Sequence, residues 1–218
     1  MFDLDGTLID SAGDLVASAN HVLETLGLCP LPADTIVGFV GNGMRNLVAR
    51  CLVASLGREV ADSEVERALG LLIEHYRAHL LDSTTLYDGV AEALRELHAH
   101  GAVLTMATNK HEAMARAILC GLGAEELFVE ILGGDSLPVR KPDPGVVFEL
   151  GRRTGIPAPD TLFVGDSTVD VATARAAGVA VCVVAWGFTP ADALVDAAPD
   201  YLITQPRELL GIAQGRAR

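Results

Sequence analysis

At 218 residues, half of them hydrophobic and 21% charged, the chain has enough apolar residues for a sizeable core, which excludes an intrinsically disordered protein. Its formal net charge is −13, from 29 acidic and 16 basic residues, so its surface is expected to repel phosphate backbones and anionic lipids. Nucleic acid and membrane surfaces are therefore excluded as expected partners, and a phosphorylated ligand would need a local cation.

A pair of acids lies at the start of the chain, where the motif DLDGT occupies residues 3–7 directly after Met1 and Phe2. In a strand, residues i and i+2 point to the same side, so Asp3 and Asp5 are expected to face one small volume. Two acids in one volume repel each other unless a cation lies between them, so the motif indicates a metal site or a nucleophile with an acid/base partner. A central strand usually has about five residues. Either the native start lies upstream, or this strand is unusually short.

The next segment, up to about residue 85, has a helical pattern. Ser11 and Asp14 are expected to form the capping box that starts the first helix. Apolar residues at helical spacing predict three helices with no strand between them, which run up to Gly27, through Met44–Leu52 and through Val65–Leu80. This segment is expected to form a small helical bundle.

From about residue 86 onward, short apolar runs alternate with helical segments. The predicted strands are 103–108, 129–132, 162–165, 179–185 and 201–203, and the predicted helices cover about 89–99, 112–120, 145–154 and 169–177. Continuous apolar strands that alternate with helices indicate a parallel sheet covered on both faces.

The strand at Phe2 is expected to belong to the same sheet, so the helical segment is an insertion. The predicted fold class is α/β, with a Rossmann-like parallel-sheet core and an inserted α-helical domain. Residues 1–11 and 86–218 are expected to form the core, and residues 12–85 the inserted domain.

Polar side chains follow several of the predicted strands, at the edge where ligands bind in sheets of this kind. After Asp3 and Asp5 come the segment 108–110 (TNK), Lys141 in a loop, and the segment 165–170 (GDSTVD). Lys110 is expected to lie at a solvated helix start, with a contact in the site as the less favoured alternative. The remaining mixture suits phosphoryl transfer: a carboxylate attacks phosphorus, Mg²⁺ held by oxygens offsets the repulsion, and a lysine balances charge. Hydroxyl and backbone N–H groups hold the other phosphoryl oxygens.

Four motifs in this order resemble those of the haloacid dehalogenase-like hydrolase superfamily: residues 3–8 (DLDGTL), Thr108, Lys141 and residues 165–170. The helical insertion after the first motif looks like the α-helical cap of that superfamily. The segments 40–43, 108–110, 132–135 and 141–144 are similar to the bacterial phosphoglycolate phosphatases within it.

The resemblance implies roles for the residues that carry the motifs. Asp3 would be the nucleophile and a magnesium ligand. Asp5 would be the acid/base and would lend its backbone carbonyl to the metal. Lys141 would bridge Asp3 and the phosphate. Asp166 would complete the Mg²⁺ site, with Asp170 contributing directly or through water.

Five further residues are candidates for substrate binding. The resemblance implies that Thr108 and the backbone of Asn109 bind phosphoryl oxygens. In the inserted domain, Gly41 and Gly43 are candidates for close approach to the substrate, and Arg45 for a bidentate contact with a substrate carboxylate. The alternatives are that the two glycines only break the chain between helices and that Arg45 is a surface arginine.

The expected function is that of a magnesium-dependent phosphomonoesterase, which hydrolyses a small phosphorylated metabolite, 2-phosphoglycolate above all, through an aspartyl-phosphate. One alternative is a hexose phosphomutase of the same superfamily, against which the Leu-, Val- and Ala-rich cap argues. A second is a non-catalytic phosphate-binding protein, against which the intact motifs argue.

Four cysteines at wide, irregular intervals are typical of reduced thiols in a cytoplasmic protein. Both a monomer and a homodimer remain open.

Overall fold

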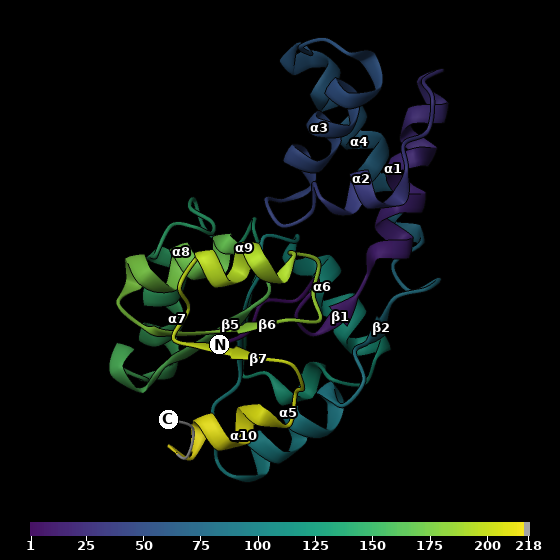
Figure 1. Cartoon of the computed structure of the whole chain (residues 1–218). Helices are drawn as coiled ribbons and strands as arrows, with labels where there is room; N and C mark the ends of the chain where they lie inside the picture. Colours follow the sequence, from purple (N-terminus) through teal and green to yellow (C-terminus); the bar gives the residue numbers. More distant parts are fainter. Residues whose placement is uncertain (216–218) are drawn as a thin grey trace. The chain divides into compact units, whose positions relative to one another are not determined.

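The computed structural model describes residues 1–215 (Figure 1). The chain forms two compact units. The core unit consists of Met1–Asp10 and the chain from Thr85 onward, and the helical unit consists of Ser11–Thr84. Each junction lies one residue before the boundary predicted from the sequence.

A parallel sheet forms the centre of the core unit, as the alternating apolar runs predicted. Its strands are β3 (Thr105–Ala107), β4 (Glu130–Leu132), β5 (Leu162–Gly165), β6 (Ala180–Val184) and β7 (Tyr201–Ile203). β3 pairs with β4, β5 with β6, and β6 with β7, in each case in parallel. The prediction of an α/β fold with a parallel sheet is therefore confirmed.

Phe2 joins the two halves of this sheet. Its backbone forms isolated bridges to Met106 of β3 and to Val164 of β5. The Phe2 N–H donates to Thr105 O at 2.8 Å, and the Phe2 carbonyl accepts from Ala107 N–H at 2.9 Å. The order across the sheet is thus β4-β3-Phe2-β5-β6-β7, and the acidic motif that follows Phe2 starts at its centre.

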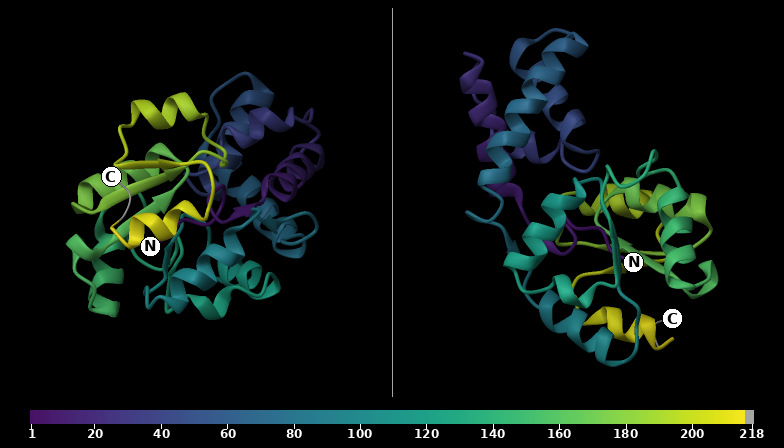
Figure 2. Two further views of the ribbon diagram at one scale, coloured as in Figure 1. Left: turned by 60° about the horizontal axis from the view of Figure 1, so that its bottom comes forward. Right: turned by 180° about the vertical axis from the view of Figure 1, so that it is seen from behind.

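Helices cover both faces of the sheet. In the core unit they are α5 (Val90–Ala99), α6 (Glu112–Gly121), α7 (Gly145–Thr154), α8 (Thr168–Ala177), α9 (Ala191–Asp196) and α10 (Glu208–Ala213), with 3₁₀ turns η1 (Glu125–Leu127) and η2 (Ala158–Asp160). Apolar residues of α7, α8 and α9 pack in one cluster around the fully buried Phe163. On the other face, α5 and α10 lie side by side (Figure 2). The short helices α9 and α10 were not predicted.

The helical unit contains α1 (Ala12–Thr25), α2 (Ala33–Val37), α3 (Met44–Leu56) and α4 (Asp62–Ala78). The three longer helices match the predicted ones, and Leu23, Leu52 and Leu72 are among the fully buried residues between them. With only five residues, α2 is too short to show a helical period in the sequence. Across the described part of the chain, no helix combines the length and the apolar character that crossing a membrane requires.

Two very short strands connect the core unit to the helical unit. β1 (Ile9–Asp10) pairs antiparallel with β2 (Thr85–Leu86), so that Ile9 lies opposite Leu86 and Asp10 opposite Thr85. The sequence predicts no strand here, because two residues cannot show an alternating pattern. The pair brings together the segments of chain that enter and leave the helical unit.

Asp14, in the first turn of α1, binds the last two residues of the helical unit. Its carboxylate accepts hydrogen bonds from the hydroxyls of Ser83 and Thr84 at 2.6 Å each, and from their N–H groups at 2.9 Å each. The predicted capping box is therefore wrong: within residues 1–215, Ser11 precedes α1 without a side-chain capping hydrogen bond. Burial alone would raise the pKa of Asp14, but the hydrogen bonds outweigh it and lower the pKa.

We predict that Asp14→Asn destabilises the protein by about 2–3 kcal/mol, because a neutral amide replaces an anion and its NH₂ group faces a backbone N–H donor of Ser83 or Thr84 in place of an accepting oxygen. The measurement is urea unfolding of both proteins at neutral pH. The control is Asp34→Asn at an exposed position of α2. If both substitutions leave the unfolding midpoint where it is, Asp14 does not hold the two ends together.

Candidate functional site

Acidic side chains from three places in the core unit meet beyond the carboxyl ends of the strands. Asp3 follows Phe2, Asp166 follows β5, and Asp170 lies in the first turn of α8. All three are buried, and one carboxylate oxygen from each lies within 4.8 Å of the others. The structure thus brings together three of the residues that the sequence predicted for the metal site.

Lys141 lies between two of these carboxylates. Its Nζ is 2.8 Å from Asp3 Oδ1 and 2.7 Å from Asp170 Oδ1, and its side chain is 2% exposed. Burial alone would lower the pKa of Lys141, but the charges of Asp170 and Asp3 outweigh it and raise the pKa. The lysine is therefore a fixed cation at neutral pH.

The acidic cluster contains three carboxylates and a single lysine, so its negative charge is not balanced. Burial raises the pKa of Asp3 to about 6, although Lys141 opposes the shift. Burial, together with the charges of Asp170 and Asp3, raises the pKa of Asp166 to about 8. Asp3 Oδ1 is buried and, among the described residues, accepts no well-directed hydrogen bond despite its closeness to Lys141. Three buried carboxylates around one lysine fit a divalent cation with oxygen ligands.

Asp166 is held by groups from two loops. Thr7 Oγ1 donates to Asp166 Oδ1 at 3.2 Å, and the Phe188 N–H donates to Oδ2 at 2.8 Å. A Cβ atom on Gly6 or on Gly187 would collide with the Asp166 carboxylate. Gly6 also has φ +80, which favours glycine. The segment at Gly187 was missed in the sequence, where a glycine directly after an apolar run was its only signal.

Asp170 has protein partners on both carboxylate oxygens. Oδ1 accepts from Lys141 Nζ, and Oδ2 accepts from Ser167 Oγ at 2.6 Å and from Ser167 N–H at 3.1 Å. Ser167 accepts in turn from the Asp170 N–H, which closes a capping box at the start of α8. Asp170 therefore fixes Lys141 to a helix start, and its part in metal binding stays a prediction.

Lys110 differs from the prediction of a solvated helix start. Its Nζ donates to Asp5 Oδ1 at 2.6 Å, with 3% of the Lys110 side chain and 14% of the Asp5 side chain exposed. The prediction was wrong because the local sequence could not show that the turn after β3 faces the turn after Phe2. Each of the two acids of the first motif thus contacts its own lysine.

The remaining predicted core residues line the same loops. Thr108 and Asn109 are buried directly after β3. Thr108 Oγ1 accepts from the Lys110 N–H at 3.2 Å, and Asn109 Nδ2 donates to the carbonyl of Lys141 at 3.1 Å. Asn109 thereby connects the loop after β3 to the loop that carries Lys141.

The other three predicted residues, Gly41, Gly43 and Arg45, belong to the helical unit. Gly43 precedes α3 with φ +84, and Gly41 has φ +111. Arg45 makes exposed ion pairs of 2.8 Å with Asp62 and with Glu66. The part of all three in substrate binding stays a prediction.

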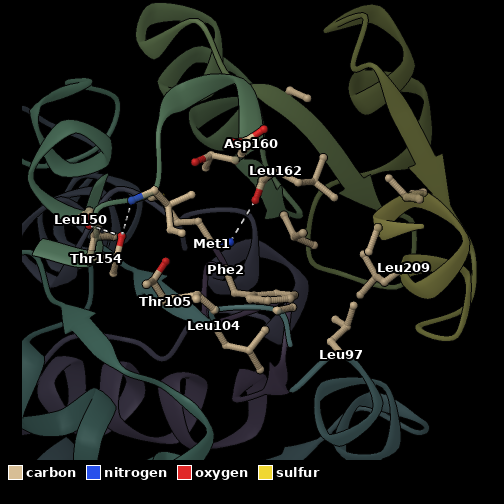
Figure 3. Close-up of a pocket in the computed structure, with 18 of the residues that line it drawn as sticks. Met1, Phe2, Leu97, Leu104, Thr105, Leu150, Thr154, Asp160, Leu162 and Leu209 are labelled. Atoms are coloured by element: carbon tan, nitrogen blue, oxygen red, sulfur yellow. Dashed lines mark hydrogen bonds between the residues drawn. The ribbon is translucent and has the colours of Figure 1, made fainter. Parts of the chain in front are cut away.

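A cavity of about 530 Å³ lies at the opposite edge of the sheet (Figure 3). Its lining includes Leu97, Leu104 and Leu209, and the start of β5 at Leu162. The Met1 ammonium group donates to the carbonyl of Leu162 at 2.9 Å. The cavity is largely apolar and lies at the amino ends of the strands. The candidate site is therefore assigned to the acidic cluster at their carboxyl ends.

Comparison with known proteins gives matches over almost the whole chain. The family model of the haloacid dehalogenase-like hydrolases matches residues 1–184. A phosphoglycolate phosphatase of Pseudomonas fluorescens is 40% identical over 212 residues, which are 96% of this chain and 77% of that protein. One of Chromobacterium violaceum is 41% identical, over 88% of this chain and 87% of that protein. A crystal structure of a predicted phosphoglycolate phosphatase from Haemophilus somnus superimposes with a TM-score of 0.92 at 32% identity, covering 98% of this chain and 96% of the other.

The raised pKa of Asp166 predicts a pH-dependent response to Mg²⁺. From about pH 4 to pH 8 the folded, metal-free protein keeps a proton on Asp166 that the unfolded chain has released, so its stability falls as the pH rises. Metal ions bind the ionised carboxylate, so the apparent Mg²⁺ affinity is expected to fall about tenfold for each pH unit below 8. Calorimetric titration of chelator-treated protein with Mg²⁺ at about pH 6, 7 and 8 measures this affinity.

The matched control is Asp160→Asn, which removes an exposed acid from the same unit and should keep the pH dependence. Equal Mg²⁺ affinity at pH 6 and pH 8 in the unsubstituted protein would contradict the raised pKa of Asp166.

Proposed function

We propose that this chain, which belongs to the haloacid dehalogenase-like hydrolase family, is a magnesium-dependent phosphatase that hydrolyses a small phosphoric monoester. The favoured substrate is 2-phosphoglycolate. The observation that carries the proposal is the buried arrangement of Asp3, Lys141 and Asp166, with Asp5 two residues from Asp3. The names of the relatives in Pseudomonas and Chromobacterium support the substrate.

Asp3 is the proposed nucleophile. Lys141 holds one of its oxygens, which orients the carboxylate and keeps it ionised. Attack of Asp3 on phosphorus forms an aspartyl-phosphate and breaks the bond between phosphorus and the ester oxygen. Mg²⁺, held by Asp3, Asp166 and the Asp5 carbonyl, would offset the repulsion between the carboxylate and the anionic phosphoryl group.

Asp5 is the proposed acid/base. It donates a proton to the ester oxygen as the alcohol leaves, and then accepts a proton from the water that attacks the aspartyl-phosphate. Hydrolysis returns Asp3 as a carboxylate and releases inorganic phosphate. The Thr108 hydroxyl and the Asn109 N–H, both at the end of β3, are suited to hold phosphoryl oxygens through these steps.

A substrate panel tests the reaction class. We expect Mg²⁺-dependent release of phosphate, fastest from 2-phosphoglycolate and slower from sugar phosphates and nucleoside monophosphates. Free phosphate is measured with excess Mg²⁺ and with a chelator. Turnover that survives the chelator contradicts the metal requirement, and conversion of one sugar phosphate into its isomer favours a phosphomutase instead.

Substitution of the two acids separates their roles. Asp3→Asn should lower kcat about a thousandfold or more, because the amide is not a nucleophile. Asp5→Asn should lower it about 10²–10⁴-fold and leave the attack by Asp3 possible for substrates with good leaving groups. Steady-state kinetics of Asp5→Asn on 2-phosphoglycolate and on p-nitrophenyl phosphate, which has the better leaving group, measure this dependence on the leaving group. Equal losses of kcat/KM on both substrates in Asp5→Asn would argue against Asp5 as the proton donor, because kcat/KM reports only the steps up to release of the alcohol.

A further inference from the structure

Lys110 is a second buried cation that the proposed chemistry does not use. The chain has only two lysines, Lys110 and Lys141, and both are buried against acids of the candidate site. Lys141 and a divalent cation together balance the charges of Asp3, Asp166 and Asp170. Lys110 therefore contributes a further positive charge, which forms an ion pair with Asp5.

The loop around Lys110 is built to hold it in place. The Lys110 N–H donates to Thr108 Oγ1, and its carbonyl accepts from the Gly134 N–H at 2.8 Å. A Cβ atom on Gly134 would collide with the backbone of Asn109, so the loop after β4 packs directly on the loop after β3. Such close backbone packing fixes where the Lys110 side chain begins.

The ammonium group also lies beside the place where a leaving group must be. Under the proposed function Asp5 protonates the ester oxygen, so that oxygen comes within hydrogen-bonding distance of Asp5. Lys110 Nζ is 2.6 Å from Asp5 Oδ1. In 2-phosphoglycolate a single methylene carbon separates the carboxylate from the ester oxygen. Any carboxylate so placed lies close to both Asp5 and Lys110.

We propose that Lys110 determines substrate specificity by binding the carboxylate of a phosphorylated 2-hydroxy acid. The inference rests on the proposed function and deepens it. The ammonium group offsets the repulsion between this carboxylate and the acids of the site, a repulsion that is absent from an ester without a carboxylate. Specificity for acidic esters then comes from the core unit, through a residue directly after β3.

The test compares two esters that differ only in the group that Lys110 would bind. They are 2-phosphoglycolate and 2-hydroxyethyl phosphate, and the variants are Lys110→Met and Lys110→Arg. Lys110→Met should lower the preference, defined as the ratio of the two kcat/KM values, about 30-fold or more, because a charged partner is lost. Lys110→Arg should keep part of it. The control is Arg95→Met, which removes an exposed charge from α5.

An equal loss of kcat/KM on both esters in Lys110→Met would overturn the proposal, because Lys110 would then act only by positioning Asp5. An unchanged ratio would overturn it as well. Failure of the unsubstituted protein to release phosphate from any ester would instead refute the proposed function.

A binding measurement keeps the proposal testable without turnover. Calorimetric titration with Mg²⁺ present compares 3-phosphonopropionate with n-propylphosphonate, which lacks the carboxylate. Lys110→Met should weaken binding of the first about 30-fold or more and change binding of the second little. If Lys110→Met weakens the binding of both phosphonates equally, or weakens the binding of neither, Lys110 does not contact the carboxylate. Thermal melting of each variant confirms that it is folded.

Discussion

The site depends on one buried cation, the ammonium group of Lys141 between Asp3 and Asp170. Carboxylates removed from water repel each other strongly, and without this lysine they would be protonated or would move apart. The lysine is held in turn: Asp170 is bound to Ser167 at the start of α8, and Asn109 binds the Lys141 carbonyl. The segments that follow Phe2, β3 and β5 are thereby all connected to Lys141.

Close approach of the backbone is the second constraint. Gly6 and Gly187 leave space for Asp166, and Gly165 leaves space for Asp170, where any Cβ atom would collide with the carboxylate. These three positions therefore have glycines for a steric reason, and Gly6 has a conformational reason as well. A site of this density requires that the loops which follow Phe2, β5 and β6 fit together to within the size of one methyl group.

Much of this arrangement could be predicted from the sequence, because apolar runs reveal strands and ligands collect where parallel strands end. On that basis Asp3, Asp166 and Lys141 were predicted to lie at one edge of the sheet, and the structure brings them together there. The contact of Lys110 with Asp5 was not predicted, since local composition does not show which neighbouring turn a side chain faces. The prediction of a capping box at Ser11 was wrong for a similar reason. The spacing of Ser11 and Asp14 fits a capping box, but Asp14 binds Ser83 and Thr84, which lie at the far end of the helical unit in sequence.

The pairing of β1 with β2 has a consequence for how the chain is assembled. Asp10 and Thr85 are cross-strand neighbours in an antiparallel pair, the arrangement that a two-residue turn closes in an ordinary β-hairpin. The helical unit thus occupies the position of a hairpin loop. Loop length adds little to the entropy of closing such a pair. A hairpin of this kind accepts insertions of very different size while the strands that present the acids stay in register.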